Sequence, residues 1–283
     1  MITVETVADL RHTLARWRAA GERVALVPTM GNLHEGHLDL VRKARSLADR
    51  VAVSIFVNPL QFGEGEDFAA YPRTLIDDSD KLGAVATDLL FTPKEAEMYA
   101  RPQHEQTRVE VPGLSDLFCG ASRPGHFVGV ATVVCKLFNM VQPDLALFGE
   151  KDYQQLLVIR QMVQDLSIPV VIHGLPTVRE VDGLARSSRN SYLSDGERSI
   201  APALYQQLQQ TAAGIKRGKH DYAALERQAI NRLESEGFTP DYYAIRRAID
   251  LAEPGPDDKS LVILAAVHLG KARLIDNIQL TLE

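Results

Sequence analysis

Short runs of apolar residues recur along the N-terminal part of the chain. They predict strands, because β-branched and aliphatic residues dominate them, at Val24–Val27, Val51–Val57, Leu89–Phe91, Leu145–Phe148 and Val170–Ile172. Strands that are apolar on both faces, instead of alternating with polar residues, are typical of a parallel sheet covered on both sides. Segments with helical periodicity lie between most of these runs, so the pattern predicts an α/β fold with a Rossmann-like, doubly wound parallel sheet.

A helical stripe follows the first predicted strand. Apolar residues at positions 38, 41, 44, 47 and 48 predict a helix over His37–Arg50, and Tyr153–Leu166 is similarly helical. Beyond about residue 185 the pattern changes to polar amphipathic helices and short strands, expected at Glu197–Arg217, Tyr222–Glu236, Tyr242–Arg246, Leu261–Val267 and Arg273–Asp276. We place a boundary near residues 175–190 and expect a sheet domain over residues 1–180 and a smaller α+β domain over residues 181–283.

Composition and charge narrow the class of protein. The chain has 283 residues, of which 45% are hydrophobic, and this indicates a folded globular protein. Its 31 basic and 37 acidic residues give a net charge of −6, so we expect no nucleic-acid partner and no acidic membrane surface. We find no apolar leader, no stretch long enough to span a bilayer, and no metal or disulfide pattern at Cys119 and Cys135. A cytoplasmic location is therefore expected.

A histidine pair follows the first predicted strand. His34 and His37 lie three residues apart at the expected start of a helix, where side chains share a face and backbone N–H groups attract anions. Gly31 and Gly36 accompany them and would let a ligand approach the backbone. A capping or packed role is the alternative for each histidine alone, and zinc is disfavoured because zinc-protease histidines are four residues apart. The absence of Gly-Lys-Ser/Thr and of G-x-G-x-x-G after the first strand disfavours P-loop and dinucleotide-binding proteins.

Two further segments contain groups that suit phosphate. Gly183–Ser191 combines serine hydroxyls with arginine guanidinium groups, although a solvated serine-rich turn is the alternative. Phe148–Gln155 follows a strand, at the edge where open α/β sheets bind ligands. There Lys151 would reach phosphate oxygens, while Gln155 would point its amide into the same crevice.

These segments resemble the pantoate–β-alanine ligases (pantothenate synthetases), a family of the nucleotidylyltransferase superfamily. The superfamily resemblance lies in the His-x-Gly-His motif and the later Ser-Ser-Arg sequence. The family resemblance rests on five ordered motifs, Ile55–Gly63, Tyr71–Thr74, Arg123–Phe127, Phe148–Gln155 and Ser187–Asn190. It implies an ATP-dependent ligase that condenses pantoate with β-alanine through a pantoyl-adenylate intermediate and releases AMP and pyrophosphate.

The resemblance also implies roles for individual residues. The positions that match the family's catalytic groups are His37, His34, Lys151 and Arg189. Those that match its ATP-binding positions are Met30, Gly31, Asn32, Leu33, His34, Glu35, Gly36, His37, Gly149, Glu150, Lys151, Asp152, Val178, Arg186, Ser187, Ser188 and Arg189. Many relatives have methionine at the position of Arg186, and an extra charge there can alter nucleotide affinity.

Substrate and metal positions follow from the same resemblance. Gln61 and Gln155 match the family's pantoate ligands, and Gln61 also matches a β-alanine ligand. Mg²⁺ would bridge the pyrophosphate oxygens with help from Asp77, for which an acidic exposed turn is the alternative. Because an acyl adenylate reacts with water, we expect the C-terminal domain to close over the ATP site and the run Gly63–Asp67 to belong to a gate. The resemblance further implies a homodimer.

Two other functions stay open on the residues alone. The first is an adenylyltransferase of the same superfamily that acts on another acceptor. A phosphate-bearing acceptor would need a basic site, where this chain has Gln61 and Gln155. The second is a tRNA-binding module, against which the net charge of −6 and the lack of an extended basic stripe both speak.

Overall fold

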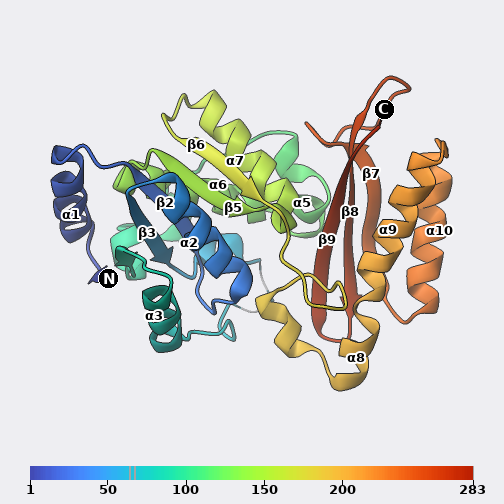
Figure 1. Cartoon of the computed structure of the whole chain (residues 1–283), viewed down its shortest axis with the longest axis horizontal. Coiled ribbons are helices and arrows are strands. Elements are labelled where there is room, and N and C mark those ends of the chain that lie inside the picture. Colours follow the sequence, from blue (N-terminus) through green and yellow to red (C-terminus); the bar gives the residue numbers. More distant parts are fainter. Residues whose placement is uncertain (64, 67, 283) are drawn as a thin grey trace. The chain divides into compact units, whose positions relative to one another are not determined.

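The computed structural model describes residues 1–63, 65–66 and 68–282, and the chain forms two compact units (Figure 1). The first unit comprises Met1–Glu150 and Gln154–Pro176. The second comprises Lys151–Tyr153 and Thr177–Glu283.

A six-stranded sheet runs through the first unit in the order β1-β4-β3-β2-β5-β6. Its strands are β1 (Ile2–Val4), β2 (Val24–Thr29), β3 (Arg50–Ile55), β4 (Leu89–Phe91), β5 (Leu145–Gly149) and β6 (Val171–Leu175). Neighbouring strands pair in parallel, and residues 24–27 and 145–148 are all buried, so both faces of the sheet are covered at its centre. The predicted doubly wound α/β class is therefore confirmed. The strand order reverses between β2 and β5, which makes the carboxyl ends of these two strands the expected ligand edge.

Helices connect the strands of this sheet. They are α1 (Val7–Ala19), α2 (Glu35–Leu47), α3 (Leu75–Ala84), α4 (Glu95–Met98), α5 (Cys119–Ser122), α6 (His126–Val141) and α7 (Tyr153–Asp165). Helix α2 lies across β2, β3 and β5, with Leu38, Val41 and Ala44 among its buried residues (Figure 1). It begins at Glu35, earlier than the predicted His37, because His34 caps it.

Helix α6 has no counterpart among the predicted helices. Its buried residues, from Phe127 to Val141, lie on nearly every side, so no polar stripe distinguishes it in the sequence. Gly125 before it and Gln142 after it both have positive φ, which sets its ends. This helix packs against the 3₁₀ turn η1 (Pro59–Gln61) that follows β3. The contact helps to position Gln61, which is one of the predicted site residues.

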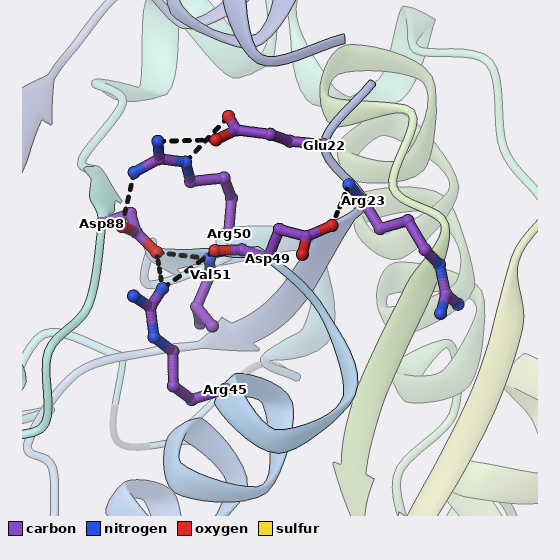
Figure 2. Close-up of polar contacts among 7 residues, drawn as sticks. All are labelled: Glu22, Arg23, Arg45, Asp49, Arg50, Val51 and Asp88. Atoms are coloured by element: carbon purple, nitrogen blue, oxygen red, sulfur yellow. Dashed lines mark hydrogen bonds and ion pairs between the residues drawn. The ribbon is translucent and has the colours of Figure 1, made fainter. Parts of the chain in front are cut away.

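Charged side chains tie the strands together at the opposite, amino-terminal edge of the sheet (Figure 2). Asp88, which precedes β4, accepts the backbone N–H of Val51 at 2.8 Å and an ion pair from Arg45. Arg50 lies between Asp88, at 3.2 Å, and Glu22, at 2.7 Å. These contacts fix where β3 begins beside β4. Ligands are instead expected at the other edge of the sheet, where the strands have their carboxyl ends.

The second unit consists of an antiparallel sheet with helices on it. The strands β7 (Thr239–Arg247), β8 (Ser260–Leu269) and β9 (Ala272–Thr281) lie in that order, and α9 (Ala203–Lys216) and α10 (Tyr222–Ser235) contact β9 and β7 respectively. The single helix predicted over Glu197–Arg217 is wrong. The segment forms α8 (Asp195–Ile200) and α9, because Pro202 has no backbone N–H to continue the first helix.

Candidate active site

The turn after β2 is held by a buried carboxylate. Gly31 and Asn32 both have positive φ, at 85° and 51°, so the chain reverses sharply there. The backbone N–H groups of Asn32 and Leu33 donate to the carboxylate of Asp78 at 2.9 and 2.7 Å. Asp78 is fully buried on α3, where the Thr74 hydroxyl donates to it at 3.1 Å. The amides of residues 32 and 33 therefore shape the turn that leads into the histidine pair.

The two histidines have fixed tautomers. His34 is the N-cap of α2, and its Nδ1 accepts the backbone N–H of Gly36 at 3.2 Å. The Nδ1 of His37 accepts the backbone N–H of His34 at 3.3 Å, and the two ring centroids lie 4.1 Å apart. A neutral ring whose Nδ1 accepts must have its proton on Nε2. Each histidine therefore presents an Nε2–H donor at a helix N-terminus, which is the arrangement that an anionic ligand requires.

The amide of Gln61 lies beside the end of β2. Gln61 is buried in η1 after β3, and its Nε2 donates to the Sδ of Met30 at 3.1 Å. The structure thus brings two predicted site residues together at the carboxyl ends of adjacent strands. Gln155 is half-buried on α7, whereas its neighbour Gln154 is buried and binds the backbone of residues 114, 117 and 119. Gln154 is therefore structural, and Gln155 keeps the role of candidate ligand.

An ion pair lies next to the backbone of Gln61. Arg123 donates to Glu66 at 2.7 and 2.6 Å and to the Gln61 carbonyl at 3.3 Å. His126 Nδ1 lies 2.8 Å from the same carbonyl, and because a carbonyl only accepts, this nitrogen must be the donor. Although burial opposes it, Arg123 lowers the pKa of Glu66 below its ordinary value. Two residues of the expected gate, Glu64 and Asp67, lie outside the described residues.

The remaining ATP candidates lie after β5 and in the second unit. Gly149 ends β5, and Glu150, Lys151 and Asp152 form the 3₁₀ turn η4 (Glu150–Asp152). The Lys151 carbonyl accepts the side-chain amide of Asn277 at 3.0 Å. In the second unit, Lys151 and Ser187 line a small cavity.

The serine-arginine loop is ordered by its own side chains. Ser187 caps the 3₁₀ turn η5 (Ser188–Tyr192) by accepting the backbone N–H of Arg189 at 3.3 Å. The carbonyl of Val178 accepts the N–H of Arg186 at 2.9 Å. The guanidinium of Arg186 pairs with Glu180 at 3.0 Å, so a neighbouring carboxylate balances its charge.

The two adjacent aspartates of α3, Asp77 and Asp78, lie in different environments. Asp77 is exposed in the first turn of the helix, while Asp78 is buried against the turn after β2. Among the described residues, no group of three or more His, Cys, Asp or Glu side chains has the arrangement of a metal site. No helix in the described part of the chain has the length and apolar content to cross a membrane.

Comparisons with known proteins find close relatives over the whole chain. The family model described as "Pantoate-beta-alanine ligase" matches residues 2–279. A protein of Shewanella baltica (strain OS223) named "Pantothenate synthetase" is 58% identical over 279 residues, covering 99% of each chain. One of the same name from Pseudomonas fluorescens (strain SBW25) is 56% identical over 283 residues, covering 100% of each chain.

Solved structures agree with these sequence relatives. A pantothenate synthetase from Thermus thermophilus has a TM-score of 0.91 at 49% identity, covering 98% of this chain and 99% of that one. A pantoate-beta-alanine ligase from Francisella tularensis, described as complexed with beta-gamma ATP and beta-alanine, has a TM-score of 0.82 at 34% identity. It covers 98% of this chain and 97% of that one.

Proposed function

Because this chain belongs to the pantoate–β-alanine ligase family, we propose that it condenses pantoate with β-alanine, using ATP, to give pantothenate. In the first step a pantoate carboxylate oxygen attacks the α-phosphorus of ATP, and the bond to the bridging oxygen breaks to release pyrophosphate. In the second step the β-alanine amine attacks the activated carbonyl, loses a proton, and displaces AMP. The observation that carries the proposal is the His34 and His37 pair, whose tautomers the backbone fixes before any ligand binds.

The first step needs positive or donating groups around the phosphates. The Nε2–H groups of His34 and His37 supply donors at the N-terminus of α2, where the helix dipole also favours negative charge. Lys151 and Arg189 add full charges, and these four are the residues to which we assign the catalytic role. The wider ATP-binding set is Met30 to His37, Gly149 to Asp152, Val178, and Arg186 to Arg189.

Pantoate recognition is assigned to Gln61 and Gln155, with Gln61 also meeting β-alanine. The Gln61 amide lies against the Met30 thioether, so a donor and an apolar surface are adjacent. This combination suits a small acid with a hydrocarbon body. Among the described residues, the guanidinium at the Gln61 backbone is that of Arg123, and Glu66 pairs with it, so its charge is already balanced. This disfavours the adenylyltransferase alternative, whose phosphate-bearing acceptor would need unbalanced positive charge.

Mg²⁺ belongs to the same proposal. A divalent ion that is held mainly by phosphate oxygens needs only one or two carboxylates from the protein, and the exposed Asp77 provides one. The ion would neutralise charge on the departing pyrophosphate. We also propose a homodimer in the cytoplasm, with residues 1–180 as the nucleotide- and pantoate-binding domain and residues 181–283 as the C-terminal domain.

The deciding experiment is exchange of labelled pyrophosphate into ATP, with Mg²⁺ and pantoate present and β-alanine absent. Exchange that requires pantoate would demonstrate a reversible acyl adenylate, and adding β-alanine should then yield AMP and pantothenate in equal amounts. Folded, ATP-binding protein that shows no exchange and forms no pantothenate with all three substrates would overturn the proposal.

A further inference from the structure

A chain of buried side chains connects Gln61 through Asn58 to Tyr99, the residue at the C-terminal end of α4. We infer that Tyr99 is a positioning residue which, acting through Asn58, holds the Gln61 amide with its NH₂ group toward the pantoate site. The inference rests on the proposed role of Gln61 and goes beyond it, because it assigns the polarity of that amide to a residue that does not touch substrate.

Two backbone groups determine which way the Asn58 amide faces, and Tyr99 adds the third contact that holds it there. The carbonyl of Gly129 can only accept, and it lies 3.1 Å from Asn58 Nδ2. The backbone N–H of Leu60 can only donate, and it lies 3.3 Å from Asn58 Oδ1. If the Asn58 amide were flipped, its oxygen would face the Gly129 carbonyl and its NH₂ group would face the Leu60 N–H, so neither hydrogen bond could form. The NH₂ group of Asn58 therefore faces Gly129, and its oxygen faces Leu60.

The close packing of η1 on α6 makes this arrangement possible. A Cβ at Gly129 would lie 2.2 Å from the Leu60 carbonyl oxygen, so only glycine permits the two segments to approach. Asn58 is 1% exposed in the resulting contact. A polar side chain this deeply buried has few orientations that satisfy its hydrogen bonds.

Tyr99 completes the bonds of the Asn58 oxygen. Its hydroxyl lies 2.7 Å from Oδ1, and because that oxygen only accepts, the tyrosine must donate. Burial, followed by the negative charge of Glu95, raises the pKa of Tyr99 above its ordinary value. The hydroxyl therefore keeps its proton and remains a donor across the physiological range.

The same logic then fixes Gln61. Asn58 Nδ2 donates to Gln61 Oε1 at 3.1 Å, so the oxygen of the Gln61 amide faces inward. Its Nε2 consequently points to the Met30 side, where it donates to sulfur at 3.1 Å. Sulfur is a weak acceptor, and a pantoate carboxylate or hydroxyl oxygen would be a stronger one. The Tyr99–Asn58–Gln61 relay thus presents a donor to an acidic substrate.

The test starts from Tyr99→Phe, which removes one hydroxyl and keeps the ring. We expect KM for pantoate to rise about fivefold, the effect of losing one hydrogen bond, with KM for ATP unchanged. Tyr243→Phe is the matched control, because Tyr243 is equally buried and donates to the Thr211 hydroxyl at 2.8 Å in the second unit. It should lower the melting temperature comparably and leave KM for pantoate at the wild-type value.

A double-mutant cycle shows whether Tyr99 acts through Gln61. In a Gln61→Ala background, Tyr99→Phe should leave kcat/KM for pantoate unchanged, because no amide remains to be oriented. An equal fall in both backgrounds would mean that Tyr99 acts by another route, and would overturn the relay. So would a Tyr99→Phe enzyme whose KM for pantoate equals that of wild type.

Asn58→Asp provides a second variant in case Tyr99→Phe does not fold. An ionised carboxylate there would turn the NH₂ group of Gln61 inward, so pantoate affinity should fall at neutral pH and recover as acid protonates the new carboxyl. Pantoate affinity that does not respond to pH in this variant would contradict the relay. Wild-type protein that forms no pantothenate would overturn the proposed function and the relay, whereas active wild-type enzyme with unresponsive variants would overturn the relay alone.

Discussion

Replacing Asp78 by asparagine tests what holds the turn after β2. The carboxylate accepts the N–H groups of Asn32 and Leu33 at 2.9 and 2.7 Å and the hydroxyl of Thr74 at 3.1 Å. An asparagine has one oxygen, so either orientation places its NH₂ group against one of the two backbone N–H groups. A buried donor without an acceptor costs about 1–3 kcal/mol. We therefore expect the free energy of unfolding to fall by about 2 kcal/mol and the melting temperature by about 5 °C.

The same change should reach the ATP site. His34 follows Leu33 directly, so an outward shift of the Leu33 backbone moves the N-cap of α2 and both of its ring donors. Even a small displacement of a catalytic group strongly lowers the rate of reaction. We expect kcat/KM for ATP to fall at least about tenfold in Asp78→Asn.

Asp77→Asn is the matched control, because it makes the same chemical change at the adjacent, exposed position. It should leave the melting temperature unchanged while raising the Mg²⁺ concentration required for activity. Thermal unfolding and pyrophosphate exchange at several Mg²⁺ concentrations measure both properties. An Asp78→Asn protein with wild-type melting temperature and wild-type kcat/KM for ATP would refute the role given to this carboxylate.

The remaining predictions concern other groups of the first unit. His37→Ala should slow pyrophosphate exchange by at least about 10²-fold, the effect of losing one positioned donor, and near-normal exchange would exclude a catalytic role. Gln155→Ala should raise KM for pantoate, whereas Gln154→Ala should mainly lower the melting temperature; an unchanged KM in the first would remove it from the site. The pKa of Glu66 is lowered in the folded state, so its pair with Arg123 stabilises the protein above the ordinary carboxyl pKa of 4.5 and is lost as pH falls. Glu66→Gln should therefore be about 1 kcal/mol less stable than wild type at pH 7 and equally stable in acid, and a pH-independent difference would contradict this.

The central strands of the sheet were predictable because burial on both faces produces continuous apolar runs in the sequence. Strand β1 was not predicted, since it is only three residues long and largely exposed. The runs at Val24–Val27 and Leu145–Phe148 are apolar at every position, which is typical of a parallel strand covered on both faces. Helix α6 could not be recognised in the sequence, because it is buried on nearly every side and therefore has no polar stripe with helical periodicity. Pro202 was a visible signal for the break between α8 and α9, and the polar periodicity on either side of it outweighed that signal.

The sequence indicated which residue types form the candidate site. It did not indicate which of these side chains contact one another. Two adjacent carboxylates, Asp77 and Asp78, look alike in the sequence, although Asp78 shares its helix face with the buried Leu82 four residues later. That spacing is a signal that could have identified the inward one. Tyr99 lies 41 positions from Asn58, so no local pattern could have connected them.

At the ends of both β2 and β3, hydrogen bonds to the backbone determine which atoms of the candidate ligand-binding side chains are donors and where these donors point. The amides of Gly36 and His34 set the ring protons of the histidine pair, and Gly129, Leu60 and Tyr99 together orient the Gln61 amide through Asn58. Donors oriented during folding need no reorganisation when negative charge develops on the substrate, and this is where electrostatic catalysis gains most. Stability and substrate affinity should consequently fall together at Asp78 and Tyr99, although neither side chain is expected to touch a substrate.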